Sequence, residues 1–399
     1  MLIGIIGKTN VGKSCLFKAL TLADVEISNR VFTTIKPNHA VGFVKTSCPE
    51  GKIESKCNPK VGYCKNGTRF VPVELLDVAG LVPGAHEGKG LGNQFLDDLI
   101  QADAFIHVID VSGSANENGE PVEKGSYDPA NDIRFLEEEI GQWFFGLMKK
   151  HWNKFSREVE MERRDLLQSL VKQFSGLKIN EEQIKEALKT TGLPTEKPAQ
   201  WTDDDLRKFA FELRKISKKM IIAANKADIP GAKENLEKLK KEFPHYDIIP
   251  CSAESELALK EADKHDLINY IPGNKDFEIA KSDGLNEKQE KALEFVKNVI
   301  GNYGSTGVQK CLDYAVFNLL NYIVAFPVAN ITKLTDKKNN ILPDAILAPR
   351  GSTLKEFAGR VHSEMAEKFM GGVDFETRRK LGADYEVKNG DIIEIILRK

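Results

Sequence analysis

The 399-residue chain is 41% hydrophobic and 29% charged, with a formal net charge of −2, a composition that allows two or three soluble globular domains. The balanced charge excludes a protein that binds DNA through a generally basic surface, and the absence of a basic-then-apolar leader or a long apolar run excludes a membrane partner. Six cysteines are few for this length and include expected core positions, which favours reduced thiols and a cytoplasmic protein.

The first predicted element is a short buried strand over residues 2–6, followed by a glycine turn and a helix. The turn reads GKTNVGKS, which fits the phosphate-binding pattern G-x-x-x-x-G-K-[ST]. Its glycines let backbone N–H groups close around phosphate oxygens, while the lysine reaches the β and γ phosphates and the serine binds Mg²⁺. The expected phosphate-binding residues are Gly7, Asn10, Val11, Gly12, Lys13 and Ser14, of which Lys13 also serves catalysis and Ser14 the metal.

The asparagine of this turn has two interpretations. Asn10 tolerates the left-handed backbone that such turns require, which would make its role conformational. Its side-chain oxygen could instead face the α and β phosphates and help to bind K⁺, a cation that offsets developing charge where no arginine is supplied. The sequence leaves both interpretations open.

The segment RVFTTIKPN, residues 30–38, falls where a mobile loop would cross the phosphates. A threonine there can bind Mg²⁺ through its hydroxyl and the γ-phosphate through its backbone, so that the triphosphate orders the loop. Thr33 and Thr34 are both candidates by spacing. The alternative is that two strand-favouring threonines simply lead into the next strand.

Three cysteines cluster in the polar stretch KTSCPEGKIESKCNPKVGYCKNG, residues 45–67: Cys48, Cys57 and Cys64. A zinc site would need a fourth ligand and usually a C-x₂₋₄-C spacing, and neither is apparent. We therefore expect a solvated loop or hairpin insertion, with metal binding as the alternative.

The strand VPVELLDVAG, residues 71–80, ends in an acid and a glycine. Asp77 lies at the strand end where α/β sheets bind ligands and can hold the Mg²⁺ hydration shell, while the N–H of Gly80 can reach the γ-phosphate. Leu81 stands where many GTPases place the glutamine that orients the attacking water, so catalysis must come from elsewhere. His86 is one candidate, although a loop histidine without a catalytic role is the simpler interpretation.

Two later strands end in groups suited to a guanine base, in KKMIIAANKAD and DIIPCSAES. The Asp228 carboxylate can accept hydrogen bonds from guanine N1–H and the 2-amino group, whereas adenine offers neither donor, a mismatch of several kcal/mol. Lys226 can lie along the base, and Asn225 can tie this loop to the phosphate loop. A backbone N–H of Ser252 or Ala253 could meet guanine O6. The predicted ligands are thus GTP and GDP.

About a hundred residues separate the strand ADAFIHVID from NKAD, where a minimal α/β unit needs one helix. Helical spacing predicts a long helix followed by shorter ones, with Asn180 and Thr202 as N-caps. Its expected apolar face is Ile133, Leu136, Ile140, Trp143, Phe144, Leu147, His151, Phe155 and Val159. Basic residues there could contact RNA, but acids alternate with them and a solvated face is the simpler interpretation: Lys149, Lys150, Lys154, Arg157, Arg163 and Arg164.

The segments FTTIKPN and DVAGLVPGAHEGKGLGNQFLDDL closely resemble the Obg-like, YchF-type translation-factor GTPases, and the resemblance runs over nearly the whole chain. The cysteine-bearing insert resembles the archaeal branch. The resemblance implies that Thr34 binds Mg²⁺, that a catalytic glutamine is absent, as at Leu81, and that Asn10 is similar to the asparagine of potassium-stimulated GTPases. Some relatives replace N-K-x-D and prefer ATP, but this chain keeps the motif, which argues for GTP.

The pattern of residues predicts that Thr353 caps a helix after the turn at Gly351. The resemblance implies an α/β P-loop GTPase (G domain) with an inserted helical coiled-coil arm and a C-terminal β-grasp (TGS) domain. Such TGS domains occur in tRNA-handling enzymes and translation GTPases, which implies contact with the ribosome or RNA through the arm and through Arg350, Lys355, Arg378, Arg379 and Lys380. The expected boundaries are 1–133 plus 216–305 for the G domain, 134–215 for the arm, 306–322 for a linking helix and 323–399 for the TGS domain.

The predicted function is Mg²⁺-dependent hydrolysis of GTP by a nucleotide-controlled switch, slow without a partner or K⁺. Two alternatives remain at this level. One is an ATP-preferring hydrolase of the same fold, and the other is an RNA- or ribosome-binding adaptor in which nucleotide turnover is incidental.

Overall fold

The computed structural model describes residues 1–21, 38–52, 56–78, 98–280 and 285–398. Within these ranges, no helix is both long enough and apolar enough to cross a membrane. The chain packs into two compact units, which are described separately. The first contains Met1–Phe17, Leu75–Glu256 and Asn298–Val308, and the second contains Lys18–Glu74, Leu257–Lys297 and Gln309–Lys399.

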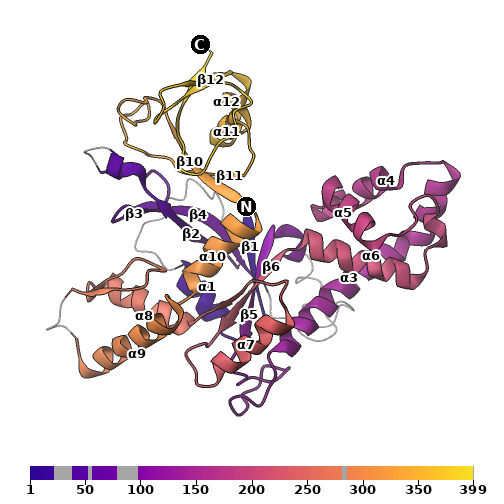
Figure 1. Cartoon of the computed structure of the whole chain (residues 1–399), viewed down its shortest axis with the longest axis horizontal. Helices are drawn as coiled ribbons and strands as arrows, with labels where there is room; N and C mark the ends of the chain where they lie inside the picture. Colours follow the sequence, from indigo (N-terminus) through magenta and orange to yellow (C-terminus); the bar gives the residue numbers. More distant parts are fainter. Residues whose placement is uncertain (22–37, 53–55, 79–97, 281–284, 399) are drawn as a thin grey trace. The chain divides into compact units, whose positions relative to one another are not determined.

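A mostly parallel sheet of seven strands has the strand order β2-β4-β1-β5-β6-β7, with β3 paired to β4 (Figure 1). β1, β5 and β6 are buried along their whole length, as expected for parallel strands covered on both faces. Because β1, β5 and β6 run parallel, the residues after their carboxyl ends share one edge of the sheet. The strands are β1 (Leu2–Ile6), β2 (His39–Ser47), β3 (Tyr63–Lys65), β4 (Thr68–Asp77), β5 (Ala104–Asp110), β6 (Met220–Asn225) and β7 (Ile248–Pro250).

Helices follow these strands, as the alternation of strand and helix patterns predicts. α1 leads away from the phosphate loop, α7 follows β6 and α8 follows β7. A small hairpin and two further helices then precede the C-terminal part. Their bounds are α1 (Lys13–Thr21), α7 (Ala232–Glu242), α8 (Ala253–Lys264), β8 (Ile268–Asn269), β9 (Glu278–Ile279), α9 (Glu287–Tyr303) and α10 (Val308–Tyr314), the last continuing into a π turn (Ala315–Leu319).

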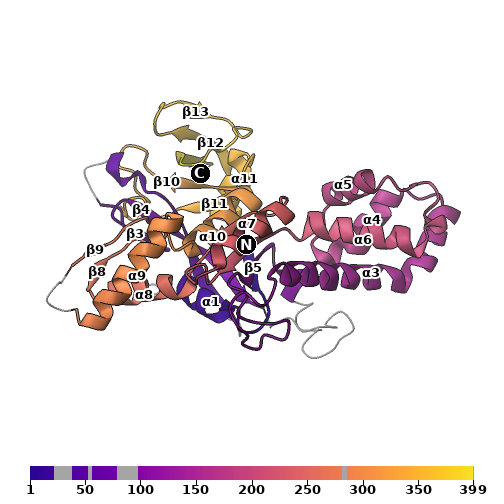
Figure 2. The same ribbon diagram turned by 60° about the horizontal axis from the view of Figure 1, so that its bottom comes forward.

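The inserted arm contains four α-helices among the described residues: α3 (Ala130–Met161), α4 (Leu166–Phe174), α5 (Glu181–Thr191) and α6 (Asp203–Ser217). In both views α6 lies between α3 and the α4–α5 pair (Figures 1 and 2). The two predicted N-caps are confirmed, since Asn180 and Thr202 each accept a hydrogen bond from the backbone N–H three residues on, in capping boxes.

The buried face of α3 differs from the predicted one in the middle of the helix. Leu147 is 39% exposed and His151 is exposed, whereas Met148 and Trp152 are buried. Spacings of three and of four residues both continue a helical stripe, so the sequence alone could not choose between them. Packing decides between them. A step of four residues from Phe144 leads to Met148 and Trp152, and Trp152 faces inward because its ring stacks on that of Trp201, with the ring centroids 5.0 Å apart.

The C-terminal region forms a five-stranded sheet of order β11-β10-β14-β12-β13, in which β10 and β14 are parallel neighbours. α11 packs on it through Leu354 and Phe357, which gives the expected β-grasp, and Thr353 caps this helix as predicted. The sequence NGD, residues 389–391, is typical of a hairpin turn. The turn forms, with the N–H of Asp391 donating to the carbonyl of Lys388 at 3.2 Å, but β14 pairs with β10 and β12, so the expectation of a hairpin is wrong. The bounds are β10 (Tyr322–Val328), β11 (Ile346–Pro349), α11 (Leu354–Val361), α12 (Ser363–Glu367), β12 (Phe369–Asp374), β13 (Lys380–Leu381) and β14 (Ile392–Leu397).

His107 on β5 should make the first unit sensitive to acid. It is 3% exposed, and its Nδ1 atom has no hydrogen-bond partner in the part of the chain that the structure describes. Burial, followed by the nearby charges of Arg214 and Lys8, lowers its pKa from 6.5 to about 3. Below pH 6.5 the unfolded chain therefore binds a proton that the folded chain refuses, and stability is lost as the pH falls from 6.5 toward 3.

Between pH 7 and pH 5 the wild type should lose about 2 kcal/mol more free energy of unfolding than a His107→Phe protein. The difference follows from about 1.4 kcal/mol for each pH unit over which only the unfolded chain binds the proton. Urea denaturation at both pH values measures the difference. His151→Phe, at an exposed histidine, is the control and should match the wild type. An equal loss in His107→Phe and wild type would show that His107 does not set the acid sensitivity.

Candidate functional site

The turn between β1 and α1 has the form that the phosphate-binding pattern predicts. α1 begins at Lys13, and the N–H of Leu16 donates to the carbonyl of Gly12 at 2.9 Å. Gly12 has a φ of +88°, and a β-carbon there would collide with Nδ2 of Asn225. Glycine is therefore needed at this position both for the backbone angle and for the close approach of the loop after β6.

The groups predicted to face the phosphates and Mg²⁺ converge at the start of α1 and the end of β4. Lys13 Nζ and Asp77 Oδ1 form an ion pair, with side chains that are 13% and 25% exposed. Ser14 lies exposed in the first turn of α1, next to Lys13. The fold thus brings a cation and a carboxylate together, with a serine hydroxyl on the residue next to the cation.

Asn10 has the left-handed backbone that its conformational interpretation predicts, with a φ of +63°. Its Nδ2 atom donates to the carbonyl of Gly119 at 2.6 Å, and the neighbouring Thr9 hydroxyl donates to the carbonyl of Asn118 at 3.1 Å. The loop that follows β5 therefore lies against the phosphate loop. An amide NH₂ group is a donor only, so Oδ1 is the atom of Asn10 that would bind a cation.

The expected base loop is joined to the phosphate loop as predicted. Asn225, at the end of β6, is buried and donates from Nδ2 to the carbonyl of Val11 at 2.8 Å. Its Oδ1 atom accepts from the N–H of Ala253 at 3.0 Å. One side chain therefore connects the turns that follow three different elements, which fixes their spacing.

Asp110 was missed by the sequence analysis, although it ends a buried strand in the same way as Asp77. It accepts a hydrogen bond from Lys226 Nζ at 2.8 Å and further bonds from Ser112 and Ser114. Burial alone would raise the pKa of Asp110, but these hydrogen bonds outweigh it and hold the pKa below its ordinary value. The ionised carboxylate anchors the ammonium of Lys226, so the stem of that lysine is held in the base loop.

Asp228 follows Lys226 by two residues and is half-buried. It forms no hydrogen bond or ion pair with any residue in the described ranges. A half-buried carboxylate without a protein partner is costly unless a ligand or water satisfies it. Asp228 is therefore placed to accept hydrogen bonds from a ligand.

The two backbone N–H groups expected to contact guanine O6, those of Ser252 and Ala253, already donate hydrogen bonds within the protein. The N–H of Ser252 donates to the carbonyl of Thr306 at 2.8 Å, and the N–H of Ala253 donates to Asn225. Both groups are thus engaged within the protein, where they fix the base loop. Contact with O6 stays a prediction, and it requires one of these N–H groups to change partner.

Several predicted residues lie outside the described residues. They belong to the two loops expected to respond to the γ-phosphate, and their roles remain predictions: Thr33, Thr34, Gly80, Leu81 and His86.

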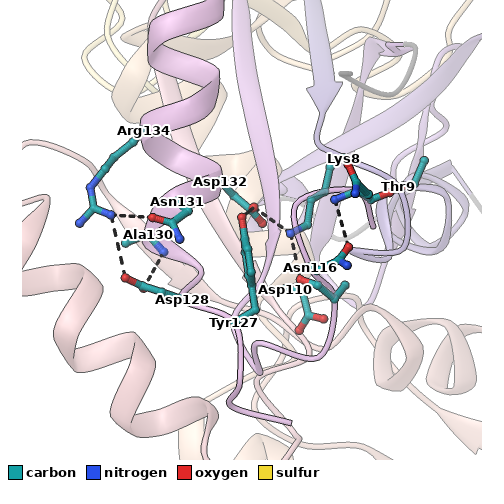
Figure 3. A network of polar contacts seen from close by, with 12 residues as sticks. Lys8, Thr9, Asp110, Asn116, Tyr127, Asp128, Ala130, Asn131, Asp132 and Arg134 are labelled. Atoms are coloured by element: carbon teal, nitrogen blue, oxygen red, sulfur yellow. Dashed lines mark hydrogen bonds and ion pairs between the residues drawn. The ribbon is translucent and has the colours of Figure 1, made fainter. Parts of the chain in front are cut away.

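A buried ion pair connects the phosphate loop to the base of the arm, and the sequence analysis missed it. Lys8 lies 2.8 Å from Asp132 in the first turn of α3 and donates to the carbonyl of Ala115 at 3.0 Å. The Tyr127 hydroxyl donates to the same carboxylate at 2.9 Å (Figure 3). Burial raises the pKa of Asp132 despite the opposing effects of Lys8 and Tyr127. No sequence motif marks Lys8, which occupies a variable position of the phosphate-loop pattern.

Three segments of the chain match known families. Residues 2–138 match the 50S ribosome-binding GTPase family, residues 223–330 match the G4 motif-containing domain of the YGR210-like Obg-like GTPases, and residues 338–397 match the TGS domain. The order of these matches is the order of the nucleotide-binding region and the β-grasp region in the structure.

Similar proteins extend over the whole chain. The GTP-binding protein MJ1332 of Methanocaldococcus jannaschii is 48% identical over 395 residues, 99% of this chain and 98% of the relative. The ribosome-binding ATPase YchF of Bacillus subtilis is 30% identical over 277 residues, 66% and 69% of the two chains. The crystal structure of a GTP binding protein from Pyrococcus horikoshii OT3 covers 100% of both chains at 35% identity and a TM-score of 0.78. The chain therefore belongs to the Obg-like, YchF-type family of P-loop GTP-binding proteins with a C-terminal TGS domain.

Proposed function

We propose that this protein is a Mg²⁺-dependent GTPase that hydrolyses GTP to GDP and phosphate. The observation that carries the proposal is the base loop, in which Asn225 is fixed from two sides while the Asp228 carboxylate has no partner among the described residues. Guanine presents two adjacent donors, N1–H and the 2-amino group, that such a carboxylate can accept. Adenine presents an acceptor at N1 and would leave the carboxylate unsatisfied.

The residues around the phosphate loop suit Mg²⁺. Ser14 and Asp77 offer a hydroxyl and a carboxylate, and Thr34 would add a second hydroxyl, so the donor set is all oxygen, as this hard cation prefers. The ion would neutralise charge on the β and γ phosphates. The contact between Lys13 and Asp77 supports this assignment, because it brings the phosphate-binding cation and the metal-binding carboxylate to one place.

Hydrolysis is expected to be slow without help. Leu81 offers no polar group to orient water, and His86 is only a weak candidate for that task. K⁺ bound at Asn10, facing the α and β phosphates, would supply positive charge that offsets the charge developing during hydrolysis. The hydrogen bond from Asn10 Nδ2 to Gly119 supports this idea, since it fixes the orientation of the amide that carries Oδ1.

The proposed partner is the ribosome, in the cytoplasm. The Bacillus subtilis relative is named a ribosome-binding ATPase, and the C-terminal match is to a TGS domain. The arm is the weaker candidate for RNA contact, because Lys149, Lys154 and Arg164 pair with Asp203, Glu158 and Glu162. In the β-grasp region Lys355, Arg379 and Lys380 are exposed, which favours that surface.

The proposed switch uses the link between Lys8 and Asp132. Thr34 and the N–H of Gly80 would respond to the γ-phosphate, and any shift of the phosphate loop would reach the first turn of α3 through this buried pair. A nucleotide-dependent change in the arm would then alter binding to the ribosome.

ATP hydrolysis is the competing proposal, because several relatives are named ATPases, among them the Obg-like ATPase 1 of Bos taurus. Multiple-turnover hydrolysis of GTP and ATP with Mg²⁺, in KCl and in NaCl, with and without ribosomes, separates the possibilities. We expect GTP to be turned over with a kcat/KM at least about a hundredfold above that for ATP, and K⁺ or ribosomes to raise the rate.

Equal or better use of ATP would overturn the base assignment. Turnover that is indifferent to base, cation and ribosome would instead indicate an adaptor that nucleotide merely stabilises. A Lys13→Ala protein that still carried out the cellular function would support that adaptor as well.

A further inference from the structure

We propose that Cys48, Glu50, Cys57 and Cys64 form a structural zinc site. The four residues come from four places: Cys48 follows the end of β2, Glu50 lies in the short 3₁₀ turn Pro49–Lys52, Cys57 lies in the coil between that turn and β3, and Cys64 lies in β3. Their ligand atoms, three Sγ and one carboxylate oxygen, all lie within 4.8 Å of one another. This site is separate from the nucleotide site, and the proposal does not depend on GTP hydrolysis.

The distances fit a tetrahedral ion. With Zn–S bonds of about 2.3 Å and a Zn–O bond of about 2.0 Å, a tetrahedron has S–S edges of about 3.8 Å and S–O edges of about 3.5 Å. Cys48 Sγ lies 3.6 Å from Cys57 Sγ, and Cys64 Sγ lies 3.5 Å from Glu50 Oε1. Two independent edges of the cluster therefore have the lengths that zinc would impose.

Backbone hydrogen bonds hold the fourth ligand in position. Glu50 Oε1 accepts from the N–H of Gly67 at 3.1 Å, and Oε2 accepts from the N–H of Cys57 at 3.2 Å. The N–H of Cys48 donates to the carbonyl of Gly67 at 2.8 Å. Such outer contacts orient the ligands of metal sites before the metal binds.

This arrangement supplies the fourth ligand that the sequence analysis did not find, while the C-x₂₋₄-C spacing is absent as stated there. The spacing is wide because the last cysteine comes from a β-hairpin. Asn66 and Gly67 both have positive φ, as a two-residue hairpin turn requires, and β3 pairs with β4 so that Cys64 lies opposite Arg69. The hairpin returns Cys64 to Glu50, which a linear motif cannot show.

The stretch from residue 48 to residue 67 would gain stability from a bound metal, because it buries little apolar side-chain surface. Among its described residues from 48 to 67, Pro49 alone is buried. Two backbone hydrogen bonds join the same stretch to the segment before β11. The N–H of Asn58 donates to the carbonyl of Ile341 at 2.8 Å, and the N–H of Lys60 donates to the carbonyl of Pro343 at 2.9 Å. A metal bound at the cluster would therefore hold this stretch in place and, through the two hydrogen bonds, would also hold the segment that precedes β11.

Zinc accounts for all four residues of this cluster, which neither a disulfide nor a hard metal ion does. A disulfide between Cys48 and Cys57 needs an S–S distance of about 2.05 Å and would leave Cys64 and Glu50 unused. A donor set of three soft thiolates and one carboxylate favours Zn²⁺ over the hard ions Mg²⁺ and Ca²⁺.

The test uses the full chain, produced with added zinc and purified through a tag without histidine. Elemental analysis by mass spectrometry should find about one zinc per chain. After the zinc is exchanged for Co²⁺, thiolate-to-cobalt charge-transfer bands and intense tetrahedral d–d bands should appear. The metal and the spectrum report on the site directly, so neither depends on nucleotide turnover.

Single substitutions then assign the ligands. Cys57→Ser, Cys64→Ser and Glu50→Gln should each weaken Zn²⁺ binding at least about tenfold in competition with a chelator, and each cysteine substitution should shift the cobalt charge-transfer bands. Cys311→Ala, outside the cluster, is the control and should bind metal as the wild type does. Wild-type protein that contains no zinc and gives no cobalt bands would overturn the proposal, as would a Cys48–Cys57 disulfide in protein that takes up no metal.

Discussion

Replacing Lys13 by alanine is expected to slow GTP hydrolysis at least about a hundredfold at saturating GTP and Mg²⁺. Removal of one preorganised group that stabilises developing charge costs about 3–4 kcal/mol in the transition state. Lys13 already lies against Asp77, so its ammonium is positioned where the metal-binding carboxylate and the phosphates would meet. The measurement is multiple-turnover phosphate release at matched protein concentrations.

The matched control is Lys18→Ala on the same helix. Lys18 is 61% exposed and its nearest acid, Glu261, is 3.9 Å away, so this substitution should leave turnover within about twofold of the wild type. Thermal melting should show that both variants are folded, because Asp77 remains partly exposed to water when its partner is removed. Full turnover in a folded Lys13→Ala protein would mean that the GKTNVGKS turn does not bind the reacting phosphate.

Replacing Asp228 by asparagine is expected to lower the affinity for GTP about a hundredfold or more and to create affinity for xanthosine triphosphate. The asparagine amide can no longer accept from both guanine donors, and its NH₂ group would face the 2-amino group. Xanthine carries a carbonyl in place of that amine, so the amide can donate to it while accepting from N1–H. Competition against a fluorescent GTP analogue measures both affinities.

Asp266→Asn serves as the control for the second prediction. Asp266 is exposed and belongs to neither the NKAD nor the CSAES motif, so the same change of carboxylate to amide should leave both affinities unchanged. Because Asp228 has no protein partner within the described ranges, its substitution should not destabilise the fold. A variant that still preferred GTP over xanthosine triphosphate would show that Asp228 does not contact the base.

Local features were predictable from the sequence because each depends on residues close together in the chain. The phosphate-loop turn follows from two glycines between an apolar strand and a helix, and Gly12 indeed has a positive φ. The caps at Asn180, Thr202 and Thr353 each satisfy a backbone N–H three residues away. The α/β class followed from the order of strand and helix patterns, whereas the β-grasp was implied by the resemblance to TGS domains.

The base loop was predictable in part. Asn225 donates a hydrogen bond to the phosphate loop as expected. The phosphate loop and the base loop follow parallel strands of one sheet, so they lie at the same edge of it. The anchoring of Lys226 by Asp110 was missed, although Asp110 ends a buried strand just as Asp77 does. The engagement of the Ser252 and Ala253 N–H groups depends on Thr306 and Asn225, which are distant in sequence.

By itself, the sequence determined the elements, the order of the nucleotide-binding motifs and the family, because these depend on composition, local spacing and order along the chain. Only the tertiary structure decided which distant groups meet where no sequence motif marks them. It placed Lys8 against Asp132, turned Met148 and Trp152 of α3 inward, and brought Glu50 to three cysteines. The physical reason is the same in each case: the deciding contact comes from packing between segments far apart in sequence, and no local preference of the chain encodes it.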